Sequence, residues 1–475
     1  MSTAQADGTR PNVVIVNADD MGYGDLGCYN PDSKIPTPHM DRLASEGVRF
    51  TDAHSSSAVC TPSRYGLLTG RYCWRTRLNQ WVIFDYEPPL IAADRMTLGT
   101  LFSNQGYATA CIGKWHLGME WPQKDGDTTD GALESEDVDF TRPIRAGPTD
   151  RGFDYFFGIR ASHDMPPYCF IENDYTVGVP SVEKDVYNPQ QREGPMVPGW
   201  RDEELEPTCT RRAVSKLTEW VTTDPDRPFF LYVPTSAPHR PCTPPAFMFG
   251  ASEAGPRGDM VAMVDWTVGQ IDQTLDALGV REDTLFIVTS DNGARATCFD
   301  GNDYGHCSNG DLRGQKADIW DGGHREPFIA RWPAGIEARR TCDETICHTD
   351  LLASFAAILE VDLPTDAGED SYDVTDALLD RPYEGPIREA TVHHSGNGMF
   401  AIRSGPWKLV LGLGSGGFTQ PVSVDPGPDE PRGQLYHLEH DPAEEHNMWD
   451  ERQDVVDELR TQLATYKAEG RSAPA

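Results

Sequence analysis

Buried strands that end in polar residues are the feature that most restricts what this chain can fold into. Residues 12–17 read NVVIVN, and the sequence Ala-Asp-Asp follows them directly. A run that is apolar on both of its alternating faces is typical of a strand covered by helices on both sides of a sheet. We therefore expect a layered α/β core built around this strand.

Helical and strand patterns then alternate along most of the chain. Helical spacing over 40–47, 98–105, 209–222 and 260–278 is followed by strand-like runs at 48–50, 107–112, 228–233 and 284–290. This alternation predicts a large, mostly parallel sheet sandwiched by helices. Short strand patterns at 391–394, 400–403, 407–411 and 434–437 precede a helical pattern over 454–469. We therefore expect a catalytic domain over 1–380 and a smaller antiparallel α+β subdomain over 381–475.

Polar residues follow four of the predicted strands at the point where each strand ends. They are Asp19 and Asp20, Lys114 and His116, His239, and Asp291 with Asn292. In parallel sheets, active sites gather in the loops beyond the carboxyl ends of the strands. These side chains are therefore expected to converge at one edge of the sheet.

The charge of the chain excludes some partners. It has 75 acidic and 41 basic residues and a formal net charge of −34. Only 8 of the basic residues are lysines, and 33 are arginines. Such a surface repels nucleic acid and anionic lipid, so we expect neither nucleic acid nor a membrane as a partner. Strong acidity is typical of proteins kept soluble in high salt, although an ordinary acidic enzyme remains an alternative.

Cysteine usage and the first residues bear on the compartment. The 11 cysteines form no paired framework and no CxxC zinc pattern, so most are expected to be free thiols. The polar lead over residues 1–10 lacks the basic and apolar regions of a secretory signal. We expect a cytoplasmic protein, with export open if a signal has been trimmed.

Cys60 begins the most informative motif. Residues 60–70 read CTPSRYGLLTG, which resembles the type I sulfatase signature, C-x-P-S-R followed by L-T-G. Further segments continue the resemblance in order, at 19–25 (DDMGYGD), 113–118 (GKWHLG), 237–241 (APHRP), 290–293 (SDNG), 313–316 (RGQK) and 435–442 (LYHLEHDP). The resemblance implies an alkaline phosphatase-like fold and a sulfuric ester hydrolase, similar to arylsulfatases and N-acetylgalactosamine-6-sulfatase-like carbohydrate sulfatases.

The resemblance also implies a modified nucleophile. In this family the cysteine is oxidised to formylglycine, so a formylglycine-generating or anaerobic maturation enzyme is an expected partner. The hydrate of the Cys60-derived aldehyde would attack sulfur and form a sulfo-enzyme intermediate. Its second hydroxyl would then let the intermediate collapse to the aldehyde and free sulfate.

A hard cation is expected beside Cys60. Asp19, Asp20, Asp291 and Asn292 offer oxygen ligands alone, which select Ca²⁺ or Mg²⁺ over zinc. The resemblance points to Ca²⁺, with the residue derived from Cys60 as a further ligand.

The cationic residues of the motifs are the next candidates. Two of the eight lysines, Lys114 and Lys316, fall inside the motifs of a chain that favours arginine. A compact ammonium can donate a proton, whereas arginine stays protonated. By resemblance, Arg64 and Lys114 hold the formylglycine hydrate, and Lys316 faces the sulfate.

Three residues are the expected acids and bases. Asp291 is the expected base for the attacking hydroxyl, and His116 by resemblance accepts the second proton. His239 faces the leaving oxygen and is the better candidate for general acid, because the reference pKa of histidine lies near neutrality.

The rest of the substrate needs other contacts. The resemblance implies that Ser162 contacts the sulfate or aldehyde group. Candidates for binding the remainder of the substrate are His163, Asp164, Glu172, Asn173 and His324. Solvated loops are the alternative interpretation of these residues, and the acidic segment 439–445 is expected to be only a capped turn.

Several functions stay open from the sequence. A sulfated sugar is the first choice of substrate and an aryl sulfate the second. A phosphonate or phosphodiester hydrolase could share the same nucleophile and cation. A non-catalytic glycan-binding protein with an unconverted Cys60 is a more remote alternative.

Overall fold

The computed structural model describes residues 10–124, 132–186, 191–295 and 304–474. Its main sheet has 11 strands in the order β12-β2-β11-β10-β1-β9-β3-β4-β5-β6, with β13 paired beside β2. These strands are β1 (Asn12–Ala18), β2 (Val48–His54), β3 (Ala108–Lys114), β4 (Tyr155–Ile159), β5 (Ile171–Glu172), β6 (Tyr175–Thr176), β9 (Phe229–Pro234), β10 (Thr284–Ser290), β11 (Arg325–Arg331), β12 (Arg340–Cys342) and β13 (Ile346–Cys347). Residues 1–9, which carry the expectation about a secretory signal, lie outside the described residues.

The centre of the main sheet is parallel, and antiparallel pairs flank it. β1 pairs in parallel with β9 and β10, and β3 pairs in parallel with β9 and β4. β11 runs antiparallel to β10 and β2, and β5 and β6 reverse direction at the other edge. The predicted large, mixed and mostly parallel sheet is therefore confirmed.

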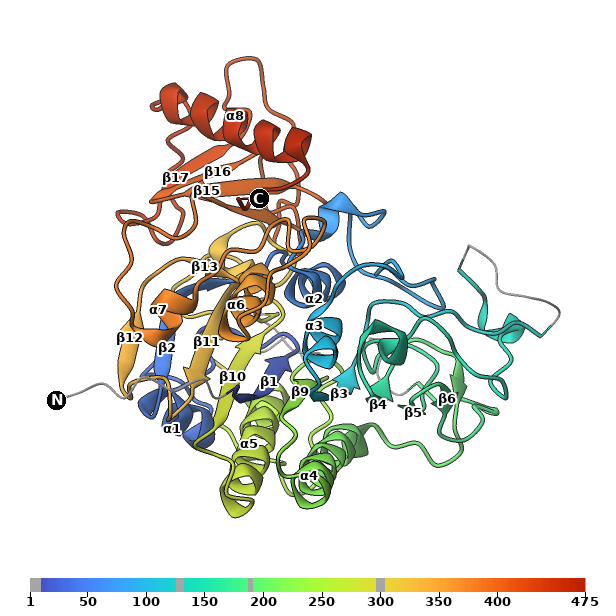
Figure 1. Cartoon of the computed structure of the whole chain (residues 1–475). Helices are drawn as coiled ribbons and strands as arrows, with labels where there is room; N and C mark the ends of the chain where they lie inside the picture. Colours follow the sequence, from blue (N-terminus) through green and yellow to red (C-terminus); the bar gives the residue numbers. More distant parts are fainter. Residues whose placement is uncertain (1–9, 125–131, 187–190, 296–303, 475) are drawn as a thin grey trace.

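Helices cover both faces of this sheet (Figure 1). They are α1 (Pro38–Ser45), α2 (Cys60–Thr69), α3 (Leu98–Asn104), α4 (Leu205–Thr223), α5 (Gly255–Ala277), α6 (Leu351–Ile358) and α7 (Thr375–Leu379). Val13 and Ile15 pack into the core shared with α2, α3 and α6, whereas Val14 and Val16 pack into the core shared with α1, α4 and α5. Because alternate side chains of β1 are buried on opposite faces, the strand has no polar face. Among the described helices, none combines the length and apolar character needed to cross a bilayer.

A second sheet, drawn in orange to orange-red in Figure 1, closes one end of the molecule beneath the red helix that follows it in the chain. Its antiparallel strands are β14 (Thr391–His394), β15 (Phe400–Ser404), β16 (Trp407–Val410) and β17 (Gln434–His437), and α8 (Gln453–Glu469) follows. One face packs on α8 through Ile402 and Leu459, and the other packs on Trp320 of the main domain through Val410. The predicted antiparallel sheet with a closing helix is confirmed, while the boundary at residue 380 stays a prediction. A two-stranded pair, β7 (Val182–Glu183) and β8 (Pro195–Met196), lies outside both sheets.

Two glycines let three neighbouring strands approach closely near their carboxyl ends. Gly113 of β3 pairs with Gly158 of β4. A Cβ atom on Gly158 would lie 1.7 Å from the carbonyl oxygen of Gly113, and one on Gly113 would lie 2.0 Å from that of Pro234 in β9. Glycine inside a strand often marks such a close backbone approach. The backbone that delivers Lys114 therefore has no room for a side chain here.

We predict that Gly158→Ala destabilises the protein by ~1–3 kcal/mol, the usual cost of an overpacked interior. Its Cβ would collide with backbone rather than with a side chain that can rotate away. Gly147→Ala is the matched control, because a Cβ on Gly147 meets no atom within 4 Å. Denaturant unfolding of both variants checks this prediction, and equal unfolding midpoints for the two would contradict it.

Candidate active site

The register of the central strands brings two carboxylates together. Ala18 of β1 pairs with Ser290 of β10, so Asp19 and Asp291 leave adjacent strands at the same edge. The Asp291 amide donates to the carbonyl oxygen of Ala18 over 2.9 Å. Asp20 adopts φ +69°, a left-handed conformation that costs a non-glycine residue about 1–3 kcal/mol. The predicted convergence at the carboxyl edge is present, and the backbone at Asp20 is strained to achieve it.

Cys60 is the first residue of α2, and its side chain points into this group of carboxylates. The Cys60 thiol donates to Asp19 Oδ1 over 3.4 Å, and Lys316 Nζ donates to Cys60 Sγ over 3.3 Å. Cys60 is 2 % exposed. Pro62 is tolerated in the first helical turn because amides there have no intrahelical partner. The positive end of the helix dipole favours negative charge at Cys60.

Three cationic side chains pair with the three carboxylates. Lys114 Nζ lies 2.7 Å from Asp19 Oδ2, and Lys316 Nζ lies 2.6 Å from Asp20 Oδ1. Arg64 holds Asp291 Oδ2 through two nitrogens, at 2.9 and 2.8 Å. We call these six residues the carboxylate–cation group. All six are buried, so each charge depends on its partner.

Burial and neighbouring charges shift the pKa values of Asp19 and Asp291 in opposite directions. Burial raises the pKa of Asp19 to about 7, although Lys114 lowers it. Burial also acts on Asp291, but Arg64, Lys114 and Lys316 outweigh it and hold the pKa of Asp291 below its ordinary value. Additional positive charge near Asp19 would therefore stabilise its ionised form.

The donor set fits a hard divalent cation. Asn292 Nδ2 donates to Asp20 Oδ1 over 2.8 Å and to the carbonyl oxygen of Gly293 over 3.0 Å, which fixes the orientation of its amide. Asn292 Oδ1 is buried and has no partner among the described residues. Ligand atoms of Asp19, Asp20, Cys60 and His239 lie within 4.8 Å of one another. An orphaned amide oxygen beside carboxylates matches the oxygen ligands that Ca²⁺ and Mg²⁺ prefer.

His116 and His239 each have one ring nitrogen fixed by a backbone carbonyl. His116 Nε2 lies 2.9 Å from the carbonyl oxygen of Ile83, and its Nδ1 is buried without a partner in the described structure. His239 Nδ1 lies 2.6 Å from the carbonyl oxygen of Arg240, and its Nε2 lies 3.8 Å from Asp20 Oδ2. Burial, reinforced by Lys114, holds the pKa of both rings well below the ordinary value. Both rings are therefore neutral, and each has one nitrogen that can accept a proton.

The loop after β4 brings part of the expected substrate set to the site. Ser162 Oγ accepts from Lys114 Nζ over 2.6 Å, so it joins the carboxylate–cation group. Both ring nitrogens of His163 are engaged, by Ser236 Oγ at 2.9 Å and by the carbonyl oxygen of Pro241 at 2.7 Å. His163 therefore holds the loop that carries His239. Asp164 is 5 % exposed, and its Oδ1 has no partner among the described atoms.

Glu172 and Asn173 do not join the site. Glu172 pairs with Phe157 of β4 and accepts from the Tyr155 hydroxyl over 2.6 Å. Asn173 Oδ1 accepts from the Phe156 amide over 3.1 Å. The expectation for these two residues needs correction, because β5 reverses direction and carries them back toward the amino end of β4.

Two buried residues that support the site carried no sequence signal. Arg257 of α5 donates to the carbonyl oxygen of Asp20 over 2.9 Å. Glu206 of α4 accepts from the amides of Ser236 and Ala237, at 2.5 and 3.0 Å, beneath the loop that carries His239. Both act through contacts between elements far apart in sequence, which spacing along the chain does not reveal.

Comparison with known proteins agrees with this geometry. The family model described as Sulfatase matches residues 11–361. The chain belongs to the sulfatase family. It is 34 % identical to an N-acetylgalactosamine-6-O-sulfatase of Bacteroides thetaiotaomicron, over 96 % of this chain and 93 % of that protein. It is 31 % identical to human arylsulfatase A, over 92 % of this chain and 83 % of that protein.

A solved structure shows the same architecture. A sulfatase of Bacteroides thetaiotaomicron, studied for the metabolism of multiple glycosaminoglycans, aligns with a TM-score of 0.83 and 32 % identity. The alignment covers 97 % of this chain and 99 % of that one. The chain itself is therefore a sulfuric ester hydrolase, and it has the predicted alkaline phosphatase-like fold.

His324 does not lie among the substrate-binding residues where it was expected. It lies in a separate cluster with His54 and His393. Its ring stacks on His393 with centroids 3.8 Å apart and planes 9° apart, and its Nδ1 lies 3.1 Å from His54 Nδ1. Its Nε2 contacts the carbonyl oxygen of Ile319 and Lys408 Nζ, both at 3.1 Å. The expectation that His324 binds substrate is corrected, because protein groups engage both of its nitrogens.

We call His54, His324 and His393 the histidine cluster. Their ligand atoms lie within 4.8 Å of one another, a spacing that suits a metal ion. A metal bound to an imidazole nitrogen lies in the plane of that ring, at about 2.0–2.1 Å for zinc. One ion cannot lie in the planes of two stacked rings, so the cluster is packed without a preformed metal site.

Burial lowers the pKa of all three rings of the histidine cluster. For His393, the rings of His324 and His54 and the ammonium of Lys408 lower the pKa further, while Asp321 opposes them. For His54, Asp52 raises the pKa and Arg403 lowers it. The folded state therefore holds the cluster neutral.

We predict that His393→Phe weakens the loss of stability in acid. Below a pH of about 6.5 the unfolded histidine binds a proton that the folded ring refuses, so stability falls as pH falls, by up to about 1.4 kcal/mol per pH unit for each such group. Phenylalanine preserves a stacking ring and removes an Nε2 that is buried without a partner among the described residues. Unfolding measured from pH 7.5 to 5 should show a shallower pH slope for the variant than for the unmodified protein.

His446→Phe is the control, because that side chain is 67 % exposed. It should keep the pH slope of the unmodified protein. Identical slopes for His393→Phe and the unmodified protein would contradict the assignment of a neutral cluster.

Proposed function

We propose that this sulfatase hydrolyses a sulfate monoester on a sugar, with a nucleophile derived from Cys60 and a bound calcium ion. The observation that carries the chemistry is the position of Cys60 Sγ, between Lys316 Nζ and Asp19 Oδ1 at the start of α2. The choice of a sugar rests on similarity to an N-acetylgalactosamine-6-O-sulfatase over nearly the full length of both chains.

The charges of the site suit an anionic ester. Three carboxylates are balanced by three cationic side chains in the carboxylate–cation group. A divalent cation held by Asp19, Asp20, Asp291 and Asn292 would leave the site positive, and a sulfate monoester is an anion. Formylglycine at position 60, formed by a maturation enzyme, would supply a hydrated aldehyde as nucleophile, and Ca²⁺ would supply a Lewis acid for a sulfate oxygen.

Proton transfer is assigned to three residues. Asp291 has a lowered pKa and is ionised, so its carboxylate can accept the proton of the attacking hydroxyl while Arg64 orients it through Oδ2. His116 Nδ1 is a buried acceptor with no partner among the described atoms, which suits the second hydroxyl proton. His239 is neutral without substrate, and the negative charge of a bound sulfate would favour its protonation at Nε2. The protonated ring can then donate to the leaving oxygen.

Asp164 is assigned to the sugar and Ser162 to the sulfate. Asp164 offers a buried carboxylate oxygen that has no partner in the described structure. A carboxylate oxygen can accept a hydrogen bond from a sugar hydroxyl. A buried acceptor without a hydrogen bond costs free energy, which such a contact would recover. Ser162 holds Lys114 Nζ and belongs on the sulfate side of the site.

An aryl sulfate is the second candidate, supported by the similarity to arylsulfatase A. A phosphonate or phosphodiester hydrolase is the third. Hydrolysis rates on N-acetylgalactosamine 6-sulfate, an aryl sulfate and the matched phosphate esters distinguish them. The highest kcat/KM on the sugar sulfate is expected, and a preference for phosphate esters would overturn the proposal.

Cys60→Ser should stop turnover and trap a sulfated enzyme. A serine hydroxyl can attack sulfur, but it has no second hydroxyl whose deprotonation expels sulfate. Mass spectrometry of the peptide containing residue 60 should show the aldehyde in the unmodified protein and one added sulfo group in the variant after exposure to substrate. Cys307→Ser, at an exposed free cysteine, should retain full activity. A peptide that contains only thiol, from active protein, would contradict the proposed nucleophile.

Removal of the cation should lower thermal stability independently of activity. An ion that binds only the folded state stabilises it by mass action. Protein treated with EDTA should regain its melting temperature when Ca²⁺ is added, and regain less of it with Mg²⁺. Asn292→Ala should weaken the response to Ca²⁺, because it removes the orphaned Oδ1.

Asn104→Ala, at an exposed residue that ends α3, is the control for this experiment and should respond as the unmodified protein does. Equal Ca²⁺ responses in Asn292→Ala and Asn104→Ala would contradict the proposed site.

A further inference from the structure

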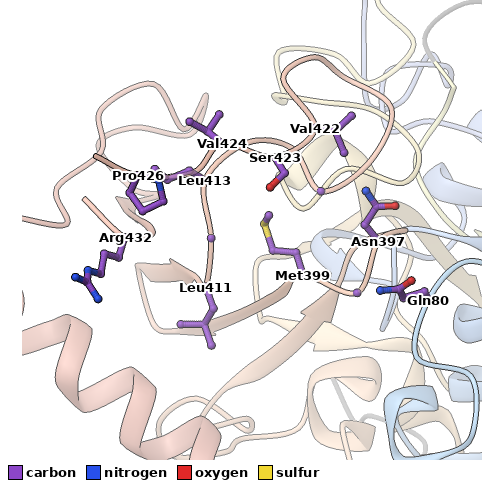
Figure 2. A pocket seen from close by; sticks show the side chains of 13 residues that line it. Gln80, Asn397, Met399, Leu411, Leu413, Val422, Ser423, Val424, Pro426 and Arg432 are labelled. Carbon is purple, nitrogen blue, oxygen red and sulfur yellow. The ribbon is translucent and has the colours of Figure 1, made fainter. Parts of the chain in front are cut away.

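A pocket of about 470 Å³ is lined by residues of the small sheet and its loops, and by Gln80 of the main domain at one end. Figure 2 shows Gln80 and Asn397 at one end of it, Met399 in the middle, and Pro426 and Arg432 at the other end. Its walls come from three separate segments of the chain: 80, 397–399 and 411–432. Pockets at the junction of two domains are common ligand sites.

Two backbone segments connect this pocket to the catalytic residues. Gln80 lines the pocket, and Ile83 three residues later holds His116 through its carbonyl oxygen. The segment also bonds to the small sheet, because the Trp81 amide donates to the carbonyl oxygen of Gly396 over 2.7 Å. The pocket wall and the support of His116 are therefore one continuous stretch of chain.

The second connection runs through Lys316. Lys316 Nζ contacts Cys60 Sγ, and the next residue, Ala317, accepts from the Gly396 amide over 2.8 Å. Asn397, which follows Gly396, lines the pocket and donates its own amide to Gly416 over 2.9 Å. Ala317 also donates its amide to the carbonyl oxygen of Ala58 over 2.7 Å, two residues before Cys60, so backbone bonds link the pocket wall to the segments that carry both Lys316 and Cys60.

The side chains of the pocket have a composition unlike the rest of the chain. Of the 13 described residues that line it, Arg432 is the only charged one, in a protein of net charge −34. Gln80, Asn397 and Ser423 add amide and hydroxyl groups, and Leu411 and Val424 are 36 and 39 % exposed. The side chains of Gln80, Asn397 and Arg432 form no hydrogen bond or ion pair with other described residues. They are therefore available to a ligand with hydroxyl groups and a negative charge.

We propose that this pocket binds the sugar units beyond the sulfated one, and that Arg432 pairs with an anionic group on them. The inference rests on the proposed function and extends its substrate from a monosaccharide to an anionic oligosaccharide. The anionic group is a carboxylate or a second sulfate, since both present oxygens to which a guanidinium donates. Gln80 and Asn397 bind the hydroxyls of the intervening sugar, and the exposed apolar side chains contact its ring.

Four substrates test the proposal with protein whose Cys60 is converted. They are the sulfated monosaccharide and the same sugar extended by a uronic acid, by a second sulfated sugar or by a neutral hexose. Arg432→Gln should lower the ratio of kcat/KM for the anionic extended substrates to that for the monosaccharide by about tenfold, mainly through KM. The ratio for the neutral extension should stay as in the unmodified protein. Whichever anionic extension loses more identifies the group that Arg432 binds.

A double variant, Gln80→Ala with Asn397→Ala, should lower the ratios for all three extended substrates. Arg460→Gln, at an exposed arginine of α8, is the matched control and should change none of them. Sugar sulfate hydrolysis with equal ratios in Arg432→Gln and Arg460→Gln would overturn the inference and leave the proposed function intact. Activity on the aryl sulfate with none on any of the four sugars would overturn both.

Discussion

The burial of three adjacent carboxylates at the carboxyl edge of the sheet is the constraint on which the rest of the site depends. Removing one cation from a buried pair leaves an uncompensated charge, which costs about 3–5 kcal/mol. The three cations arrive from separate elements: Lys114 ends β3, Arg64 lies in α2, and Lys316 lies in a loop after β10. Their alignment depends on the close approach of neighbouring strands, which is why Gly113 and Gly158 leave no room for a Cβ.

Pairing with a buried carboxylate is shared by half of the lysines of the chain. Four of its 8 lysines are buried, and each is within 2.8 Å of a carboxylate oxygen: Lys114, Lys184, Lys316 and Lys408. An ammonium on a slender stem can enter a small space and give its three protons to several acceptors, as Lys114 does with Asp19 and Ser162. Arginine needs a planar arrangement of acceptors. Lysine thus survives in the interior of a protein whose basic residues are mostly arginines.

The hydrophobic pattern of the sequence was enough to predict the central strands. It also predicted that the residues at their carboxyl ends meet, because the shared direction of parallel strands brings those residues together. The pattern did not predict α2, because Pro62 and Gly66 are poor helix formers. Every residue of this helix is buried, so packing stabilises it.

The pattern also failed for Glu172, which a hairpin turns back, and for His324, whose partners His54 and His393 come from β2 and β14. The capped turn expected at 439–445 is present, because Asp441 accepts from the amides of Glu445 and His446, but the burial of Glu444 and its pairing with Lys408 at 2.8 Å had no sequence signal. The positions of His324 and Glu444 depend on contacts between elements far apart in sequence, and that of Glu172 depends on the direction of a short hairpin strand, neither of which propensity and spacing encode.

At the junction of the two sheets, the residues that perform the chemistry and the loops of the small sheet come from different parts of the fold. Lys408 of β16 bonds Asp321 of the main domain and Glu444 beyond β17, with all three buried, so the small sheet is fixed against the loop that follows Lys316. The chemistry is confined to strand ends and α2, where a shift of any backbone would leave charges unpaired. The loops of the small sheet also contact the segment that carries Lys316, through the backbone bond from Gly396 to Ala317 and through the amides of Phe418 and Thr419, which donate to Asp318. None of these loops supplies a member of the carboxylate–cation group. Substrate selection can therefore change in the small sheet while the carboxylate–cation group stays fixed, which is how one scaffold can serve many sulfate esters.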